Sequence, residues 1–311
     1  MIYKKLLNYS KWIWSAAVLA AVVYYLLKNW RIVSSYFVTL NEINLLCAVI
    51  LLFCGKLALV LLSKNAVAAE GLNLSYKKMF TIVSITQLGK YIPGGVWHFV
   101  GRYNMYHEHD LSLKKSTKSL ITENFWMLTG AISSGLIFAC FSPYFPGVLL
   151  KLGINIPSEI LTLCGILIIF SWFGVMVFFD RLFRLKGQQQ KIGSLVSLLF
   201  AQFLCWSCFG LSFALIFQNL VINGLSMTIS YYSLGWIVGF VAVFAPGGIG
   251  IREAALVWLF SNFYPAQEIL VYSTVHRFIF FVVEIILGII AWRLNAGETK
   301  YSYKTDNPSE K

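Results

Sequence analysis

The sequence predicts an all-α integral membrane protein with about six spanning helices and two re-entrant helical hairpins. Of its 311 residues, 58% are hydrophobic and only 12% are charged, whereas an ordinary soluble domain has roughly 25% charged residues. Two Pro-Gly-Gly sequences, at 93–95 and 246–248, interrupt apolar sequence. Such helix breaks are tolerated at membrane depth only where the freed backbone groups face protein or water.

Six apolar runs are each close to the ~20 residues that a spanning helix needs: 12–27, 43–63, 120–141, 160–179, 194–218 and 269–292. No small-residue cleavage site follows the first run, so we expect an uncleaved anchor rather than a signal peptide. We expect a single membrane domain over residues 1–292, with a first half of about 1–150 and a second half of about 160–292. Residues 293–311 are expected to form a cytoplasmic polar tail.

The basic residues indicate how the chain is oriented. If both termini are cytoplasmic, 18 of the 25 lysines and arginines fall in cytoplasmic segments, as the positive-inside rule requires. These residues are spread over short loops instead of one face, so the net charge of +12 does not predict nucleic-acid binding. We expect the membrane as the environment and no nucleic acid as a partner.

The first Pro-Gly-Gly sequence lies in a segment, 79–100, that has basic residues on both sides. Both ends of the segment are therefore expected in the cytoplasm. This predicts a hairpin with arms at about 79–91 and 96–106, broken at Pro93, Gly94 and Gly95.

The second Pro-Gly-Gly sequence lies in a segment, 226–263, with weakly charged flanks that are expected outside. Its second arm, 252–263, would be about 18 Å long, which is too short to span. We predict a hairpin that enters from outside, although one full crossing at 228–245 followed by a partial helix also fits. Entry of two hairpins from opposite sides is typical of an inverted-topology repeat, with a site between the repeats.

The second hairpin predicts an anion site. Its turn contains Gly247, Gly248 and Gly250, and Arg252 and Glu253 open the returning helix. Free backbone N–H groups, the positive end of a helix and a guanidinium would then meet at one place. Arginine also has a planar fork of donors that suits phosphate.

Further charged residues fall within apolar segments: Lys56, Lys90, Glu123, Arg277 and Glu284. A charge at the bilayer centre costs about 2.5–3.5 kcal/mol, so these side chains should face one another or a wet cavity. Together with Arg252 and Glu253 they leave one positive charge in excess, which suits an anionic ligand. Arg277 and Glu284 share a helix face, from which they reach the Arg252 site or pair locally. Glu123 is a candidate partner for Lys90 or Lys56.

On the returning arm of the first hairpin, His98 and Arg102 are four residues apart and share a helical stripe. With Lys90, they are candidates to cradle a phosphate at the cytoplasmic side. The structural alternative is that Arg102 marks the interface and His98 satisfies a local carbonyl.

The sequence offers no catalytic or cofactor motif. P-loop, nucleophile-elbow, zincin and Rossmann patterns are missing. The His and acidic residues at 107–110 read as a solvated loop, and all six cysteines lie in predicted spans. We expect no cofactor, no metal and no catalytic residue.

The stretch FAPGGIGIREAAL resembles the Pro-Gly-Gly-x-Gly-x-Arg-Glu signature of the lysylphosphatidylglycerol synthase transmembrane family, which is flippase-like. The match covers Pro246, Gly247, Gly248, Gly250, Arg252, Glu253 and Ala254. The first hairpin is similar in placement, but Trp97 and His98 stand where that family commonly has glycine and an acid. The carry-over of function to the first hairpin is therefore weaker.

The resemblance implies a stand-alone membrane domain that translocates an anionic phospholipid or a polyprenyl-phosphate-linked sugar across a bacterial or archaeal cytoplasmic membrane. It implies no synthesis of lysyl lipid, since the soluble synthase domain is missing. A homo-oligomer and partners in cell-envelope biosynthesis are further expectations. The alternative is an integral-membrane glycosyltransferase with Glu123 or Glu253 as base, or a non-transporting accessory of envelope assembly.

Overall fold

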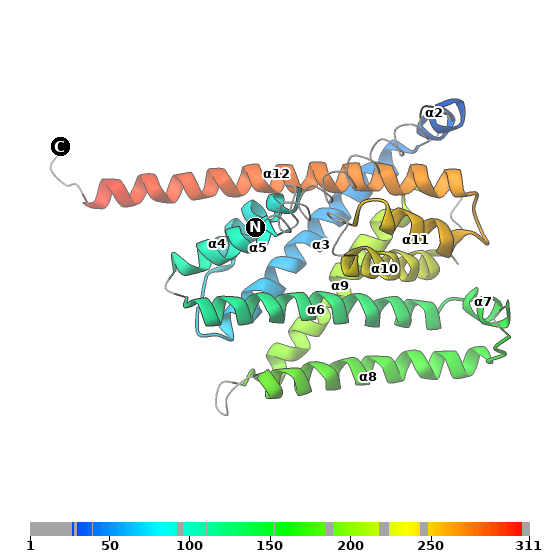
Figure 1. Ribbon diagram of the computed structural model, residues 1–311, viewed down its shortest axis with the longest axis horizontal. Coiled ribbons are helices and arrows are strands. Elements are labelled where there is room, and N and C mark those ends of the chain that lie inside the picture. The colour runs from blue at the N-terminus through cyan, green and yellow to red at the C-terminus, as the bar shows by residue number, and fades with distance from the viewer. Residues whose placement is uncertain are drawn as a thin grey trace, which may run out of the picture.

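The computed structural model describes Leu27 and residues 30–38, 40–91, 96–109, 111–151, 153–183, 189–217, 224–242 and 248–306. Every regular element in these ranges is a helix (Figure 1). The prediction of an all-α membrane protein is therefore confirmed. The exact number of membrane spans stays a prediction, because the run at 12–27 lies outside the described residues apart from Leu27.

Four described helices are long and apolar enough to cross a membrane. They are α3 (Glu42–Ala68), α8 (Ser158–Phe183), α9 (Ile192–Ala214) and the part of α12 (Ala266–Asp306) that ends at Asn295. Four of the six predicted runs coincide with these helices. Helix α12 itself continues to Asp306 and therefore includes much of the segment 293–311, which we expected to form a polar tail.

The predicted run at 120–141 falls in α6 (Leu113–Cys140), which is 28 residues long but less apolar. Its polar residues face inward, since Ser119, Thr122, Ser133 and Ser134 are all buried. A helix that turns its hydroxyl groups toward other helices can lie in a membrane with a low mean hydropathy, because those groups are removed from lipid.

The first Pro-Gly-Gly segment folds into two short arms. The first arm comprises α4 (Tyr76–Gln87) and the 3₁₀-helix η1 (Leu88–Tyr91), and the second is α5 (Trp97–His107). At helical rise α4 and α5 are about 18 and 16 Å long, so neither crosses the ~30 Å hydrocarbon core. The arms meet closely at Gly89, where an added Cβ would lie 2.8 Å from the backbone N of His98. The break itself, at 92–95, lies outside the described residues.

The second segment forms α10 (Leu225–Val241) and α11 (Ile251–Phe260). At helical rise they are about 26 and 15 Å long, both shorter than the hydrocarbon core. Two glycines of α10 let α11 approach it. A Cβ at Gly235 would lie 2.9 Å from Leu256 Cδ2, and a Cβ at Gly239 would lie 3.0 Å from Arg252 Cβ. The structure thus has a helix pair here rather than a single long helix.

Helices α6, α8 and α12 run roughly along the long axis of the molecule, and α3 and α9 cross it obliquely (Figure 1). At one end of this axis α3 and α8 end and α6 and α9 begin, while α6 ends and α8 and α12 begin at the other (Figure 1). The short α2 (Trp30–Val38) precedes α3, and α7 (Phe145–Lys151) lies between α6 and α8.

The two hairpins are attached to opposite ends of the molecule. The first connects the end of α3 to the start of α6, and the second connects α9 to the start of α12 (Figure 1). This placement agrees with the predicted entry from opposite sides. A pseudo-two-fold relation between the halves stays a prediction.

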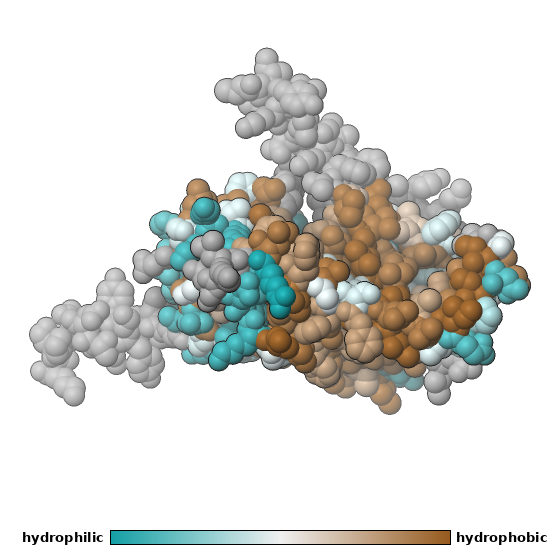
Figure 2. Space-filling model, turned by 90° about the horizontal axis from the view of Figure 1, so that it is seen from below, coloured by the Kyte–Doolittle hydropathy of each residue, from teal (hydrophilic) through white to brown (hydrophobic). Residues whose placement is uncertain are grey.

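The surface and the core fit a membrane environment. Figure 2 shows a broad apolar band on one face, with hydrophilic residues gathered toward the two ends. Helix α8 exposes Leu163, Leu167, Phe170 and Phe178, as expected for a helix that faces acyl chains. A single core cluster includes buried residues from both halves of the chain, for example Leu52, Met79, Trp206 and Tyr272. The two halves therefore share a core, and the prediction of a single domain stays a prediction.

Candidate functional site

Helix α12 carries the two charged residues around which the site is built. Arg277 and Glu284 are seven residues apart, so they lie on the same face of the helix at a separation of about 10 Å along its axis. Glu284 is only 2% exposed. A carboxylate that is so well buried requires charged or hydrogen-bonding partners.

Glu284 joins three elements of the fold. Its Oε1 accepts from Lys56 Nζ of α3 and, at 2.6 Å, from Lys90 Nζ of η1. The hydroxyl of Tyr91, in the same turn of η1, donates to Oε2. One carboxylate thus connects α3 and the first hairpin to α12.

Aromatic rings surround the two lysines. Lys56 Nζ lies 4.1 Å and Lys90 Nζ 5.0 Å from the centroid of the Phe280 ring. The Tyr91 ring packs edge-on against Phe281, with 4.7 Å between centroids. Glu284 can neutralise only one of the two lysines, so the negative faces of these rings help to stabilise the second positive charge.

The second hairpin meets α12 through Glu253. Gly248 and Gly250 have φ angles of +68° and +85°, which only glycine adopts readily, so the chain can turn into α11 at this point. Glu253 Oε2 then accepts from the Gly250 backbone N at 2.8 Å and closes the first turn of the helix. Glu253 Oε1 lies 2.9 Å from Arg277 NH1. Gly247 lies outside the described residues.

Arg252 differs from the other cations of the site. Its guanidinium lies over the ring of Tyr232 on α10, with Cζ 4.5 Å from the ring centroid. Within the part of the chain that the structure describes, no carboxylate is ion-paired with Arg252, and its buried Nε has no hydrogen-bond partner. Arg252 therefore keeps an N–H donor, at Nε, that an anion could use.

Arg102 is 4% exposed, and its guanidinium is fully engaged. It is paired with Glu123 of α6, and it donates to Thr86 Oγ1 and Gln87 Oε1 of α4, at 3.2 Å each. Glu123 was expected to pair with Lys90 or Lys56. The structure gives it a different partner, because α5 brings Arg102 between α4 and α6.

His98 lies on α5 one turn before Arg102, as predicted. Its Nδ1 is buried and, within the described ranges, lacks a hydrogen-bond partner. The carbonyl partner that the structural alternative assigned to this histidine is therefore not seen at Nδ1. His98 remains a candidate to contact a ligand, whereas Arg102 mainly fastens the first hairpin to α6.

The interior ion pairs leave an excess of positive charge. The described residues of this region supply five cations, Lys56, Lys90, Arg102, Arg252 and Arg277, and three carboxylates, Glu123, Glu253 and Glu284. The excess of two is larger than the single charge expected from sequence, since Arg102 was not among the charges counted within apolar segments. Such a region favours an anion near both hairpins.

Three aromatic residues of the site were missed from sequence. Tyr91 follows Lys90 directly and lies in the same turn, so a role for Lys90 was a weak indication that Tyr91 also lies near Glu284. Tyr232 is twenty positions before Arg252, and Phe280 is one of many phenylalanines in apolar runs. Only the packing of α10 and α12 reveals what these two rings contact.

The fold and the site define a multi-pass membrane protein with a positively charged interior formed by two helical hairpins. A family model described as the lysylphosphatidylglycerol synthase TM region matches residues 12–288. The chain therefore belongs to this family, as its Pro-Gly-Gly-x-Gly-x-Arg-Glu sequence suggested. No curated protein matches the chain.

Proposed function

We propose that the protein translocates an anionic lipid, either a phospholipid or a polyprenyl-phosphate-linked sugar, across the cytoplasmic membrane. The observation that carries this proposal is Arg252, a cation in the interior without a carboxylate partner among the described residues. A phosphate diester carries one negative charge, and a guanidinium can bind two of its oxygens at once. Arg252 would bind the headgroup phosphate while the acyl or prenyl chains remain in lipid.

The positions of the hairpins suggest how both sides of the membrane gain access to this site. Each hairpin is short, is attached to an opposite end of the molecule, and is connected to α12 by an ion pair, Lys90 with Glu284 or Arg277 with Glu253. Opening one pair at a time would expose the interior to one leaflet and then to the other. This is the alternating access that transporters with inverted repeats use.

Orientation follows from the charges. The segments 64–78, 102–119 and 180–191 contain many of the basic residues, and their described parts lie at the end of the molecule where α3 ends (Figure 1). We assign that end to the cytoplasm by the positive-inside rule. Both termini would then be cytoplasmic.

Translocation can be measured with purified protein in vesicles that contain fluorescent phosphatidylglycerol, by quenching the label in the outer leaflet. Arg252→Gln should slow translocation about tenfold or more, since a hydrogen bond to a charged group contributes about 1.5–3 kcal/mol. The translocation rate of Arg252→Lys should lie between the rates of the native protein and of Arg252→Gln, because lysine keeps the positive charge but lacks the planar set of donors of a guanidinium. Arg181→Gln, at an exposed arginine of α8, is the matched control.

Equal rates for the native protein and a folded Arg252→Gln variant would reject the assignment. The same vesicles distinguish the rival classes. Transfer of a radiolabelled sugar from a lipid-linked donor without translocation would indicate a glycosyltransferase, in which case Glu123 or Glu253 would first have to leave its arginine. Neither activity, with the interior ion pairs intact, would indicate an accessory of envelope assembly.

A further inference from the structure

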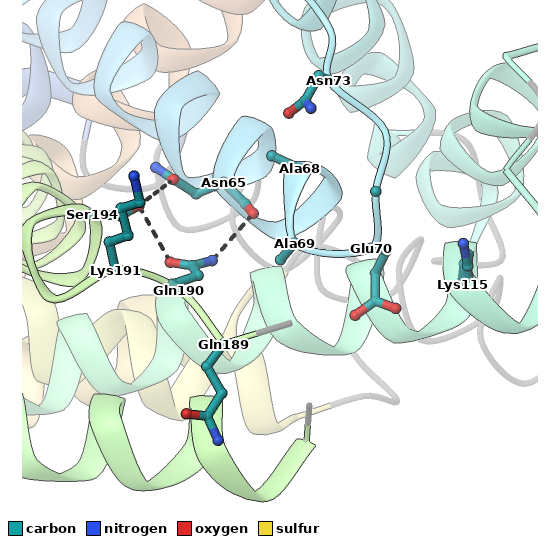
Figure 3. A pocket seen from close by; sticks show the side chains of 11 residues that line it. Asn65, Ala68, Ala69, Glu70, Asn73, Lys115, Gln189, Gln190, Lys191 and Ser194 are labelled. Atoms are coloured by element: carbon teal, nitrogen blue, oxygen red, sulfur yellow. Dashed lines mark hydrogen bonds between the residues drawn. The ribbon is translucent and has the colours of Figure 1, made fainter. Parts of the chain in front are cut away.

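A surface cavity lies away from the Arg252 site, at the lysine-rich end of the molecule. It is formed where α3 ends, where α6 begins and where the chain enters α9 (Figure 3). Its volume is about 540 Å³, within the range of ~300–1,000 Å³ that small-molecule sites occupy. On α3, Asn65 lies nine residues after Lys56, so the cavity is about 13 Å along the helix from the interior lysine.

One wall of the cavity is a hydrogen-bonded network of amides. Gln190 Nε2 donates to Asn65 O at 3.4 Å, and Ser194 Oγ donates to Asn65 Oδ1 at 3.2 Å (Figure 3). The backbone N of Gln190 donates to Asp180 Oδ2 at 2.9 Å, which holds the start of this wall against the end of α8. Asn65 and Gln190 are thus held in place and fix the shape of this wall before any ligand arrives.

The opposite wall supplies charge. Glu70 lies 3.3 Å from Lys118 and is largely neutralised by it. Lys115 points toward the turn at Gly71, where an added Cβ would lie 3.9 Å from its Nζ. Of the carboxylates in the described ranges, none is ion-paired with Lys115 or with Lys191 across the cavity. The cavity is therefore positively charged, with amide groups and one carboxylate available to hydroxyls.

We propose that this cavity binds a phosphorylated sugar, either as a soluble molecule or as the head of a lipid. The lysines suit the phosphate. The amides of Asn73 and Gln189 can both donate to and accept from sugar hydroxyls, and the Glu70 carboxylate can accept from them. Binding here requires no translocation, so the cavity can be tested independently of the Arg252 site.

The test uses the full chain in nanodiscs of phosphatidylcholine, titrated calorimetrically with glucose 1-phosphate. Lys115→Gln should weaken binding about fivefold, the upper range for one exposed ionic contact. The double variant Lys115→Gln with Lys191→Gln should weaken it further. Lys114→Gln is the matched control, because Lys114 is its exposed neighbour and does not line the cavity. All these lysines are exposed, so folding should be preserved.

Unchanged binding in the double variant, equal losses for Lys114→Gln and Lys115→Gln, or no binding by the native protein would overturn the proposal. A second titration, in nanodiscs that contain prenyl-phosphate glucose, identifies the source of the ligand. Competition with glucose 1-phosphate would show that the cavity takes a lipid headgroup, and additive binding would show a soluble ligand. Arg252→Gln should leave the first titration, in phosphatidylcholine alone, unchanged, so failure of the transport proposal would not be mistaken for failure of this one.

Discussion

Glu284→Gln should destabilise the protein strongly, because Glu284 is the only described carboxylate that pairs with Lys56 and Lys90. The substitution keeps the shape of the side chain but removes its charge. Lys56, which is 7% exposed, would then be buried beside a second lysine with no counter-charge. Removing one partner of a buried ion pair typically costs about 3–5 kcal/mol.

This cost can be expressed as a shift in melting temperature. With an unfolding entropy of about 2.1 cal/mol/K per residue, a chain of this length should lose about 5–8 °C. The assay is thermal unfolding in detergent, followed by tryptophan fluorescence at a fixed scan rate, since unfolding of such proteins is commonly irreversible. Glu42→Gln, at an exposed glutamate of α3, is the control and should change the midpoint by no more than about 1 °C.

A second substitution tests the cause. Adding Lys56→Met to Glu284→Gln removes the uncompensated charge and should recover part of the lost stability, since apolar replacements of buried pairs are often tolerated. The reasoning is refuted if Glu284→Gln melts within 1 °C of the native protein. It is equally refuted if Lys56→Met makes the glutamine variant still less stable.

Three other experiments test the fold and its orientation. Gly248→Ala should lower the free energy of unfolding by about 1–3 kcal/mol, because Gly248 has a positive φ and lies close to the α10 backbone. Gly193→Ala is the control and should melt like the native protein, because an added Cβ there would meet open space. Arg102→Lys should melt lower than the native protein, because an ammonium cannot reach all three partners of the guanidinium in the same geometry; an unchanged midpoint would contradict that geometry. In a cysteine-free background, an impermeant maleimide should label Lys115→Cys only from the cytoplasm and Ser261→Cys only from outside; labelling of both from one side would contradict the topology.

Much of the fold could be predicted because it depends on local sequence. Apolar runs of sufficient length and Pro-Gly-Gly breaks locate the helices and the turns between them. The predicted arms at 79–91 and 96–106 correspond closely to α4 with η1 and to α5. The mean hydropathy of α6 was a poorer guide, since its serines and threonines face other helices rather than lipid.

The candidate site could be predicted only in part. Burial in lipid requires charges to find partners, so the involvement of Glu284 and Arg277 follows from sequence. Which cation each acid meets depends on how the helices pack, and Glu123 meets Arg102 for that reason. The cavity near Asn65 has no sequence signal, because its amides come from segments far apart in the chain.

The central claim is that Arg252, which pairs with no carboxylate among the described residues, supplies the positive charge that holds an anionic lipid in the interior. Native mass spectrometry of protein extracted from vesicles of mixed phosphatidylglycerol and phosphatidylcholine tests this claim most directly. The account predicts that the native protein retains phosphatidylglycerol in preference to phosphatidylcholine and that Arg252→Gln loses this preference. Equal retention of both lipids by the native protein, or an undiminished preference in the variant, would contradict it.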